Sequence, residues 1–333
     1  MKDQKNTIVS NNHMVVLLTM LLSGWVIFTD IYIYSKLGLI LFTVITLLFL
    51  NGLGRKIPIK ELIVLIMLMQ MVVSPIIVFD YLYNKVHYPM VVGEQYYISY
   101  VFFCIVLFII GLFLPLHRQK PNILKTISNI NESAPFNGKF GVVLIIFGLL
   151  AGTIVDYVPG TFRFAVFLIE NCKYIGAFYL FFSNNRYKYL WILVVYSMLT
   201  YTTIGGGLFI NLFIWTFLFA IVAAFKYKVN LLVKTGFFII GIFIAFFIQS
   251  FKTEYREVIW EGKGQAYSEQ TRTNQEVFVE MATERALDTK SLYEYSNYSN
   301  FISRLNQGWI LAKVLIHVPA NEPFTNGEVF LSD

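Results

Sequence analysis

Three charged side chains follow the last strongly apolar stretch of the sequence, in which residues 237–247 carry no charge. Lys252, Glu254 and Arg256 point the same way if this segment is extended, and Lys252 and Arg256 still share a face if it is helical. Arginine binds phosphate oxygens through two parallel hydrogen bonds. The segment therefore predicts a site for an anionic ligand, such as a lipid-linked diphosphate, where the apolar stretch ends. The alternative is a set of solvated charges at a helix end.

A second polar group lies near the end of the sequence and consists of Arg304, Asn306, Gln307 and His317. Arg304 could hold a phosphate, and the two amides could hydrogen-bond to sugar hydroxyls. His317 is a candidate general base, because an unperturbed imidazole titrates near neutral pH. A structural role is the favoured reading of His317, since it is a lone histidine just before a proline.

The third group interrupts an apolar segment at Arg163, Glu170 and Lys173. Positions 163 and 170 are seven apart and share a helix face, and Lys173 lies within one turn of Glu170. Ionisable groups at bilayer depth are costly and usually line a cavity or a substrate path. The three residues are therefore candidates for substrate binding, and the alternative is an ion pair that only tethers helices.

Motifs of several well-known enzyme classes are absent from the sequence. It contains no glycine-rich phosphate loop before a Lys-Ser or Lys-Thr pair, no His-Glu-x-x-His and no paired aspartates in a basic loop. These absences argue against an ATP-driven pump, a zinc protease and a processive cytoplasmic synthase. Cys104 and Cys172 fall within predicted spans and form no zinc-ligand spacing. We expect no metal and no cofactor.

The elements that must position these residues are membrane-spanning helices. Only 14% of the residues are charged and 57% are hydrophobic, whereas soluble domains carry about 25% charged residues. The apolar residues occur in blocks, and a bilayer requires about 20 apolar residues per helical span. We predict an all-α polytopic membrane protein, whose basic loop residues report orientation and not binding to nucleic acid.

We predict about nine spans from the apolar blocks. They cover residues 14–29, 33–53, 58–80, 96–116, 139–157, 161–182, 189–204, 208–225 and 231–251. Every second loop is basic, and the loops between them are not. The basic loops hold Lys2, Lys5, Arg55, Lys56, Lys60, Arg118, Lys120, Lys125, Lys139, Arg186, Lys188, Lys226, Lys228 and Lys234. By the positive-inside rule the N-terminus is cytoplasmic.

This orientation divides the chain into a transmembrane bundle, residues 1–251, and an extracytoplasmic polar region, residues 252–333. In the polar region we predict amphipathic helices over residues 274–287 and 300–318, the second stopping at Pro319. The chain ends abruptly at Asp333. We expect it to be a fragment, with further spans following.

Three segments of the polar region resemble bacterial oligosaccharide repeat-unit polymerases of the O-antigen (Wzy) type. They are Phe251-Lys252-Thr253-Glu254-Tyr255-Arg256, Ser303-Arg304-Leu305-Asn306-Gln307-Gly308-Trp309-Ile310 and Pro323-Phe324-Thr325-Asn326-Gly327-Glu328. The resemblance covers roughly the last eighty residues, and the rest matches only in hydropathy.

The resemblance implies a metal-independent glycosyltransferase of the bacterial inner membrane. Such enzymes polymerise repeat units carried by undecaprenyl diphosphate on the outer face, for lipopolysaccharide or another surface polysaccharide. Residue by residue, it implies that Arg256 and Arg304 hold the diphosphate with support from Lys252. Glu254 or His317 would then be the base for the acceptor hydroxyl. Its implied partners are the lipid-linked oligosaccharide, membrane lipid, and the chain-length regulator and flippase of the pathway.

Other functions fit the same features. An O-antigen ligase would share the bundle, the outer region and the arginines. A transporter or flippase of lipid-linked sugars would make use of Arg163, Glu170 and Lys173, although the sequence lacks the two related halves usual in transporters. A non-catalytic component of a polysaccharide assembly complex is the remaining alternative.

Overall fold

The computed structural model describes residues 17, 19–114, 138–227, 229–261, 273–292 and 294–323, and all regular structure in these residues is helical. Seven helices are long and apolar enough to cross a membrane, which confirms a polytopic membrane protein. They cover Ile33–Gly52, Ile59–Tyr81, Glu94–Phe113, Gly160–Phe182, Lys188–Gly206, Ile210–Tyr227 and Leu231–Trp260.

The seven spans account for seven of the nine that the sequence predicts. The eighth, expected over 139–157, is helix α7 (Lys139–Ile154), which is apolar but only 16 residues long. It gives way to a short 3-10 turn at Val155–Tyr157. The remaining predicted span, over residues 14–29 at the start of the chain, lies partly outside the described residues. In its described part, residues 19–27 are helical. The prediction of nine full-length spans is therefore not confirmed.

Contacts divide the chain into two compact units. Unit 1 consists of residues 1–116, 229–251 and 284–333, and unit 2 of residues 117–228 and 252–283. Helix α11 (Leu231–Glu261) runs from one unit into the other without a break. The change in composition at Lys252 therefore does not end a helix, and the division by contacts differs from the division by composition.

The membrane span Ile59–Tyr81 of unit 1 is irregular because of Pro75. The span consists of α3 (Ile59–Leu68), a π-helical segment η1 (Met69–Val73), α4 (Ser74–Ile76) and a second π-helical segment η2 (Ile77–Tyr81). Proline has no backbone N–H, so the carbonyl of Met71, four residues earlier, lacks its helical donor. The hydroxyl of Tyr97 in α5 (Glu94–Phe113) donates to this carbonyl at 3.1 Å. The freed carbonyl is thus satisfied within the protein, as apolar surroundings require.

The polar region contains one predicted helix and one correction. Helix α13 (Asn274–Leu287) confirms the amphipathic helix predicted over 274–287. The single helix expected over 300–318 is instead two helices, α15 (Tyr295–Leu305) and α16 (Gly308–His317). The break lies at Asn306, whose backbone is extended (φ −76°, ψ 91°). Just after it, Gly308 packs so closely that a Cβ there would collide with the Tyr97 hydroxyl and lie 2.7 Å from Cγ of Pro75.

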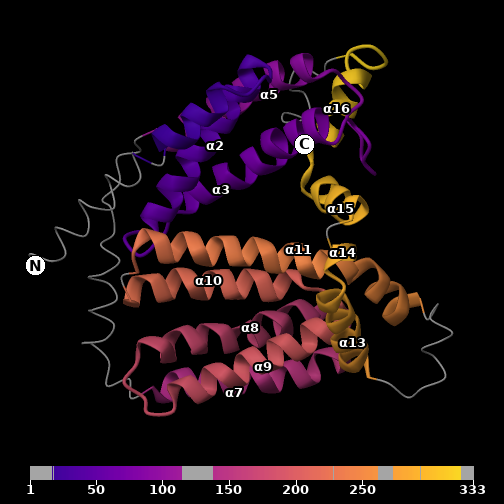
Figure 1. Ribbon diagram of the computed structural model, residues 1–333. Coiled ribbons are helices and arrows are strands. Elements are labelled where there is room, and N and C mark those ends of the chain that lie inside the picture. The colour runs from indigo at the N-terminus through magenta and orange to yellow at the C-terminus, as the bar shows by residue number, and fades with distance from the viewer. Residues whose placement is uncertain are drawn as a thin grey trace, which may run out of the picture. The chain divides into compact units, whose positions relative to one another are not determined.

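Unit 2 is built on α7, α8 (Gly160–Phe182), α9 (Lys188–Gly206) and α10 (Ile210–Tyr227), which run side by side in Figure 1. Helices α7 and α8 approach most closely at glycines. A Cβ on Gly176 would lie 2.6 Å from the Gly141 carbonyl oxygen, and one on Gly148 would lie 2.5 Å from the Lys173 amide nitrogen. Small residues of this kind allow membrane helices to pack backbone to backbone.

Two glycines one turn apart on α7 make this packing testable. A Cβ on Gly148 would meet backbone atoms of α8, whereas one on Gly152 would lie 3.4 Å from the flexible side chain of Glu170. We expect Gly148→Ala to lower the free energy of unfolding by about 1–3 kcal/mol through overpacking. Gly152→Ala should be neutral or slightly stabilising, because alanine is the better helix former. Thermal unfolding in detergent measures both variants, and equal melting temperatures would contradict this account of the interface.

Candidate functional site

The C-terminal end of α9 is held by side chains from two other helices of unit 2. The last carbonyls of a helix have no partner within the helix and must find donors elsewhere. Here the Asn274 side-chain amide donates to the Gly205 carbonyl at 2.9 Å, and the Trp260 indole N–H donates to the Gly206 carbonyl at 3.2 Å. Gly207, which follows the helix, has φ +64°, a left-handed conformation that suits glycine.

Arg256, a predicted phosphate ligand, contributes to this helix end. Its Nε–H donates to the Gly207 carbonyl at 3.0 Å, and its guanidinium lies 4.6 Å from the centre of the Trp260 ring. A cation is favourable at a helix C-terminus, where the helix dipole is negative. The arginine is therefore positioned by a hydrogen bond on one side and by an aromatic ring on the other.

Tyr255 anchors the same region from within. Its side chain is fully buried, and its hydroxyl lies 2.6 Å from the Ile204 carbonyl and 3.1 Å from the Asn274 carbonyl. Its ring packs against Phe209 and Phe278 with centroid distances of 6.4 and 5.5 Å. Tyr255 thus ties α11 to α9 and α13 directly beside Arg256.

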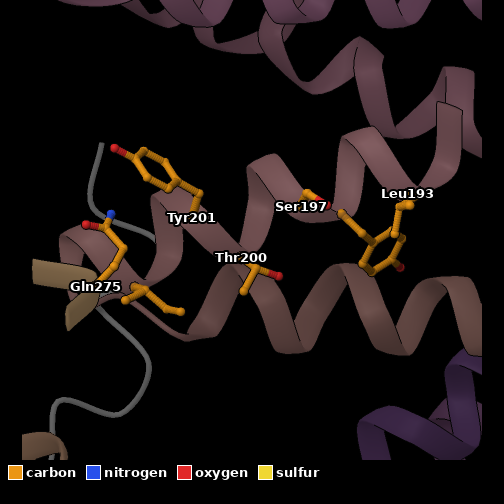
Figure 2. Close-up of a pocket in the computed structure, with 7 residues that line it drawn as sticks. Leu193, Ser197, Thr200, Tyr201 and Gln275 are labelled. Carbon is orange, nitrogen blue, oxygen red and sulfur yellow. The ribbon is translucent and has the colours of Figure 1, made fainter. Parts of the chain in front are cut away.

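An open groove of about 460 Å³ runs along one face of α9 toward this end (Figure 2). Its lining residues recur at helical spacing on α9, with one addition from α13: Leu193, Tyr196, Ser197, Thr200, Tyr201, Ile204 and Gln275. Figure 2 shows Leu193 and Ser197 toward one end of the row and Tyr201 with Gln275 toward the other. The groove therefore mixes apolar and polar side chains along its length, with Leu193 toward one end and Tyr201, Ile204 and Gln275 toward the other.

Lys252 and Glu254 extend along the same helix as Arg256. Because α11 is helical here, Lys252 and Arg256 share a face, and Glu254 is about 200° away from Arg256 around the helix axis. Lys252 is half-buried and Glu254 is exposed. The structure therefore brings the two cations to one face and does not place the predicted base beside them.

The second predicted group lies in unit 1 and is not a single cluster. Arg304 is exposed in the last turn of α15, and the Gln307 side-chain amide donates to its carbonyl at 3.4 Å. Asn306 is fully buried, with its amide nitrogen 3.4 Å from the sulfur of Met90. A buried amide cannot reach a sugar at the surface, so the position of Asn306 fits a structural role at the break between α15 and α16.

His317 ends α16 and is exposed. Its Nε2 lies 3.3 Å from the Glu322 carboxylate, and its Nδ1 lies 3.3 Å from the Asn321 side-chain amide. These partners are at most five residues away in sequence. The surroundings of His317 fit the structural role that the sequence favours for a lone histidine.

The third predicted group lies on α8 in unit 2. The Lys173 ammonium lies 2.6 Å from Glu170 Oε1, so these two residues form the ion pair that the sequence offers as the alternative to substrate binding. Only 2% of the Lys173 side chain is exposed, compared with 25% for Glu170. Arg163 is exposed near the start of the helix. The stripe therefore consists of a buried pair and a separate surface cation.

Sequence reasoning missed the neutral members of the α9 site. Tyr255, Trp260 and Asn274 lie close in sequence to the charged residues that were selected, but none carries a charge. The predicted span over 189–204 ends just before the three consecutive glycines at 205–207. Three glycines at the end of a helix, with hydrogen-bond donors in the polar segment that follows, were the available signal.

Predicted residues on the basic loops also have local partners. In unit 1 the Lys60 ammonium donates to the Leu112 carbonyl in the last turn of α5 at 2.6 Å, and Lys56 pairs with the buried Glu61. Pro323 is described, but the rest of the third resemblance segment, residues 324–328, lies outside the described residues.

A scan against protein-family models and searches of curated proteins and of solved structures found no significant match to this chain.

Proposed function

We propose that this chain is a membrane glycosyltransferase that polymerises oligosaccharide repeat units carried on undecaprenyl diphosphate. The observation that carries the proposal is the groove on α9, which leads along a membrane span to a helix end where Arg256 is fixed. A lipid-linked diphosphate has the same order of parts: a long apolar chain, then a doubly charged phosphate group, then sugar.

The lining of the groove supports this assignment. The polyprenyl chain would lie along the groove from Leu193, and the end that holds Tyr201 and Gln275 would face the diphosphate and the first sugar. Tyr201 offers a flat ring and a hydroxyl, and Gln275 offers an amide that can donate and accept. These groups are of the kind that binds sugar hydroxyls.

In the proposed reaction, the role of Arg256 is to stabilise the leaving diphosphate. The acceptor hydroxyl attacks the anomeric carbon of the growing chain, the bond from that carbon to the diphosphate oxygen breaks, and undecaprenyl diphosphate leaves with the bonding electrons. The hydroxyl proton passes to a base, and Glu254, the predicted base within unit 2, lies on the opposite face of α11 from Arg256. Guanidinium groups neutralise the charge that develops on the leaving diphosphate.

The remaining parts of the proposal concern location and partners. The reaction takes place at the outer face of the bacterial inner membrane, with residues 252–333 extracytoplasmic. A flippase supplies the lipid-linked units, and a chain-length regulator limits the product. Lys252, which shares a face of α11 with Arg256, assists with the diphosphate.

The experiment that tests this function is an electrophoretic profile of surface polysaccharide from a strain that lacks the gene. We expect the ladder to collapse to core bearing a single repeat unit, and to return when the gene is supplied on a plasmid. Loss of every unit from the core would point instead to a ligase or a flippase. An unchanged ladder would contradict a role in this polymer.

A further inference from the structure

Three membrane spans of unit 2 end at a cluster of cations that the proposed function does not use. Helix α8 ends at Phe182, α9 begins at Lys188 and α10 ends at Tyr227. Lys188 donates to the Ser183 carbonyl at 3.0 Å, and Lys226 donates to the Phe181 carbonyl. The two ammonium groups therefore bind carbonyls two residues apart at one helix end.

Within the part of the chain that the structure describes, acidic residues do not compensate the charge of this cluster. Residues 183–190 and 221–227 contain no Asp or Glu, and Arg186 adds a further positive charge. Among the described residues, no carboxylate forms an ion pair with Lys188 or Lys226. The C-terminus of α8 supplies only about half a negative charge. Two like charges held this closely favour an anion between them.

Aromatic side chains complete the cluster. The Tyr189 and Tyr227 hydroxyls lie 3.3 Å apart, which joins the start of α9 to the end of α10. The Lys226 ammonium is 4.2 Å from the centre of the Phe181 ring, and the Lys188 ammonium is 5.4 Å from that of Tyr189. Both tyrosines are exposed. Exposed tyrosines at the ends of spans are typical of the headgroup level of a bilayer.

We propose that Lys188 and Lys226, with the Tyr189 and Tyr227 hydroxyls, bind the phosphate of an anionic phospholipid headgroup. An ammonium group has three donors, so each lysine that bonds one carbonyl retains donors for a phosphate oxygen. The tyrosine hydroxyls add donors beside them. Because all four residues lie at the ends of membrane spans, the phosphate at this level is that of a lipid.

The test is a lipid titration of the purified full chain in detergent, followed by native mass spectrometry. We expect the protein to bind phosphatidylglycerol about tenfold more tightly than phosphatidylcholine, given the attraction of basic residues to anionic lipid. The double variant Lys188→Gln/Lys226→Gln should lose this preference. Glutamine removes the charge and keeps an N–H donor, on a side chain one bond shorter than that of lysine.

Lys60→Gln is the matched control, because Lys60 also donates to a last-turn carbonyl of a span but belongs to unit 1. It should keep the preference for phosphatidylglycerol. If Lys60→Gln loses the preference as fully as the double variant, the effect is general charge and the proposal is overturned. Equal binding of the two lipids by the unmodified protein would overturn it as well.

Two further measurements cover the remaining outcomes. Tyr189→Phe/Tyr227→Phe removes only hydroxyls, so it tests the site even if the lysine variant does not fold, and we expect about threefold weaker binding of phosphatidylglycerol. Unchanged binding in a folded tyrosine variant would exclude the hydroxyls and contradict the proposed site. Inorganic phosphate is added in competition, and displacement of the lipid at matched concentration would show a site for free phosphate instead.

Discussion

Arg256→Ala is expected to reduce surface polymer by about 100-fold or more, because removing one preorganised donor to a developing negative charge typically costs that much in rate. The side chain is positioned before any ligand arrives, with Nε on the Gly207 carbonyl and the guanidinium over Trp260. Preorganisation is what makes such a donor effective, so loss of this one residue should affect turnover and not only binding.

Arg256→Lys separates this catalytic role from a structural one. Lysine keeps a positive charge near the C-terminus of α9, so the favourable interaction with the helix dipole remains and the protein should stay folded. It lacks the planar fork that binds phosphate in a bidentate manner. We therefore expect normal protein level and melting temperature with polymer still strongly reduced.

The measurement is the polysaccharide ladder of the deletion strain complemented with each variant, normalised to protein in the membrane fraction. Arg285→Ala serves as the control, because Arg285 is another arginine of the polar region, in the last turn of α13, and has no role in the proposed mechanism. A normal ladder from Arg256→Ala would remove Arg256 from the proposed mechanism. A ladder lost equally in Arg285→Ala would show that the assay reports general loss of positive charge.

The sequence predicts the membrane helices well because a single physical constraint determines them. A bilayer span needs about 20 apolar residues, and seven helices of the structure match predicted spans. Hydropathy is less informative about where each helix ends. Helix α7 falls short of a full span, and α11 continues through Lys252 to Glu261 although the composition becomes polar.

The same limit applies to the break between α15 and α16. The sequence from Asn300 to Val318 contains no proline and has helical periodicity, so a single helix was the reasonable prediction. The break lies at the buried Asn306, next to the close approach of Gly308 to Tyr97 and Pro75, which only the fold creates. Partners more than 200 residues away in the chain cannot be read from local pattern.

The candidate sites also differ in how far the sequence could predict them. The Glu170–Lys173 pair could be predicted because its residues are three apart on one helix. The site at the end of α9 could be predicted only for Arg256, since Trp260 and Asn274 reach the glycine carbonyls from 54 and 69 residues away in sequence. A charged residue next to an apolar segment can be recognised from the sequence. A neutral hydrogen-bond donor to a helix end can be recognised only once the position of that helix end is known.

Glu170→Ala is expected to lower the free energy of unfolding by about 3 kcal/mol, because it leaves the Lys173 ammonium buried without its carboxylate. Lys173 is fixed in place by more than the pair. Its backbone packs against Gly148 of α7, and its ammonium lies 5.3 Å from the centre of the Tyr174 ring. The cation therefore cannot readily move to water when its partner is removed. Chemical denaturation in detergent measures the loss.

The double variant Glu170→Leu/Lys173→Met decides whether the pair only tethers the helix. Replacing a buried ion pair with apolar residues of similar size is often neutral or stabilising, so we expect the double variant to recover the stability that Glu170→Ala loses. If the pair has no other role, the double variant should also make polymer normally, and exchanging the two residues should restore function lost in either single variant. A double variant that is as stable as the unmodified protein but makes no polymer would contradict this interpretation. The two charges would then be required for binding the substrate, because the apolar replacement would have kept the stability of the protein and abolished its activity.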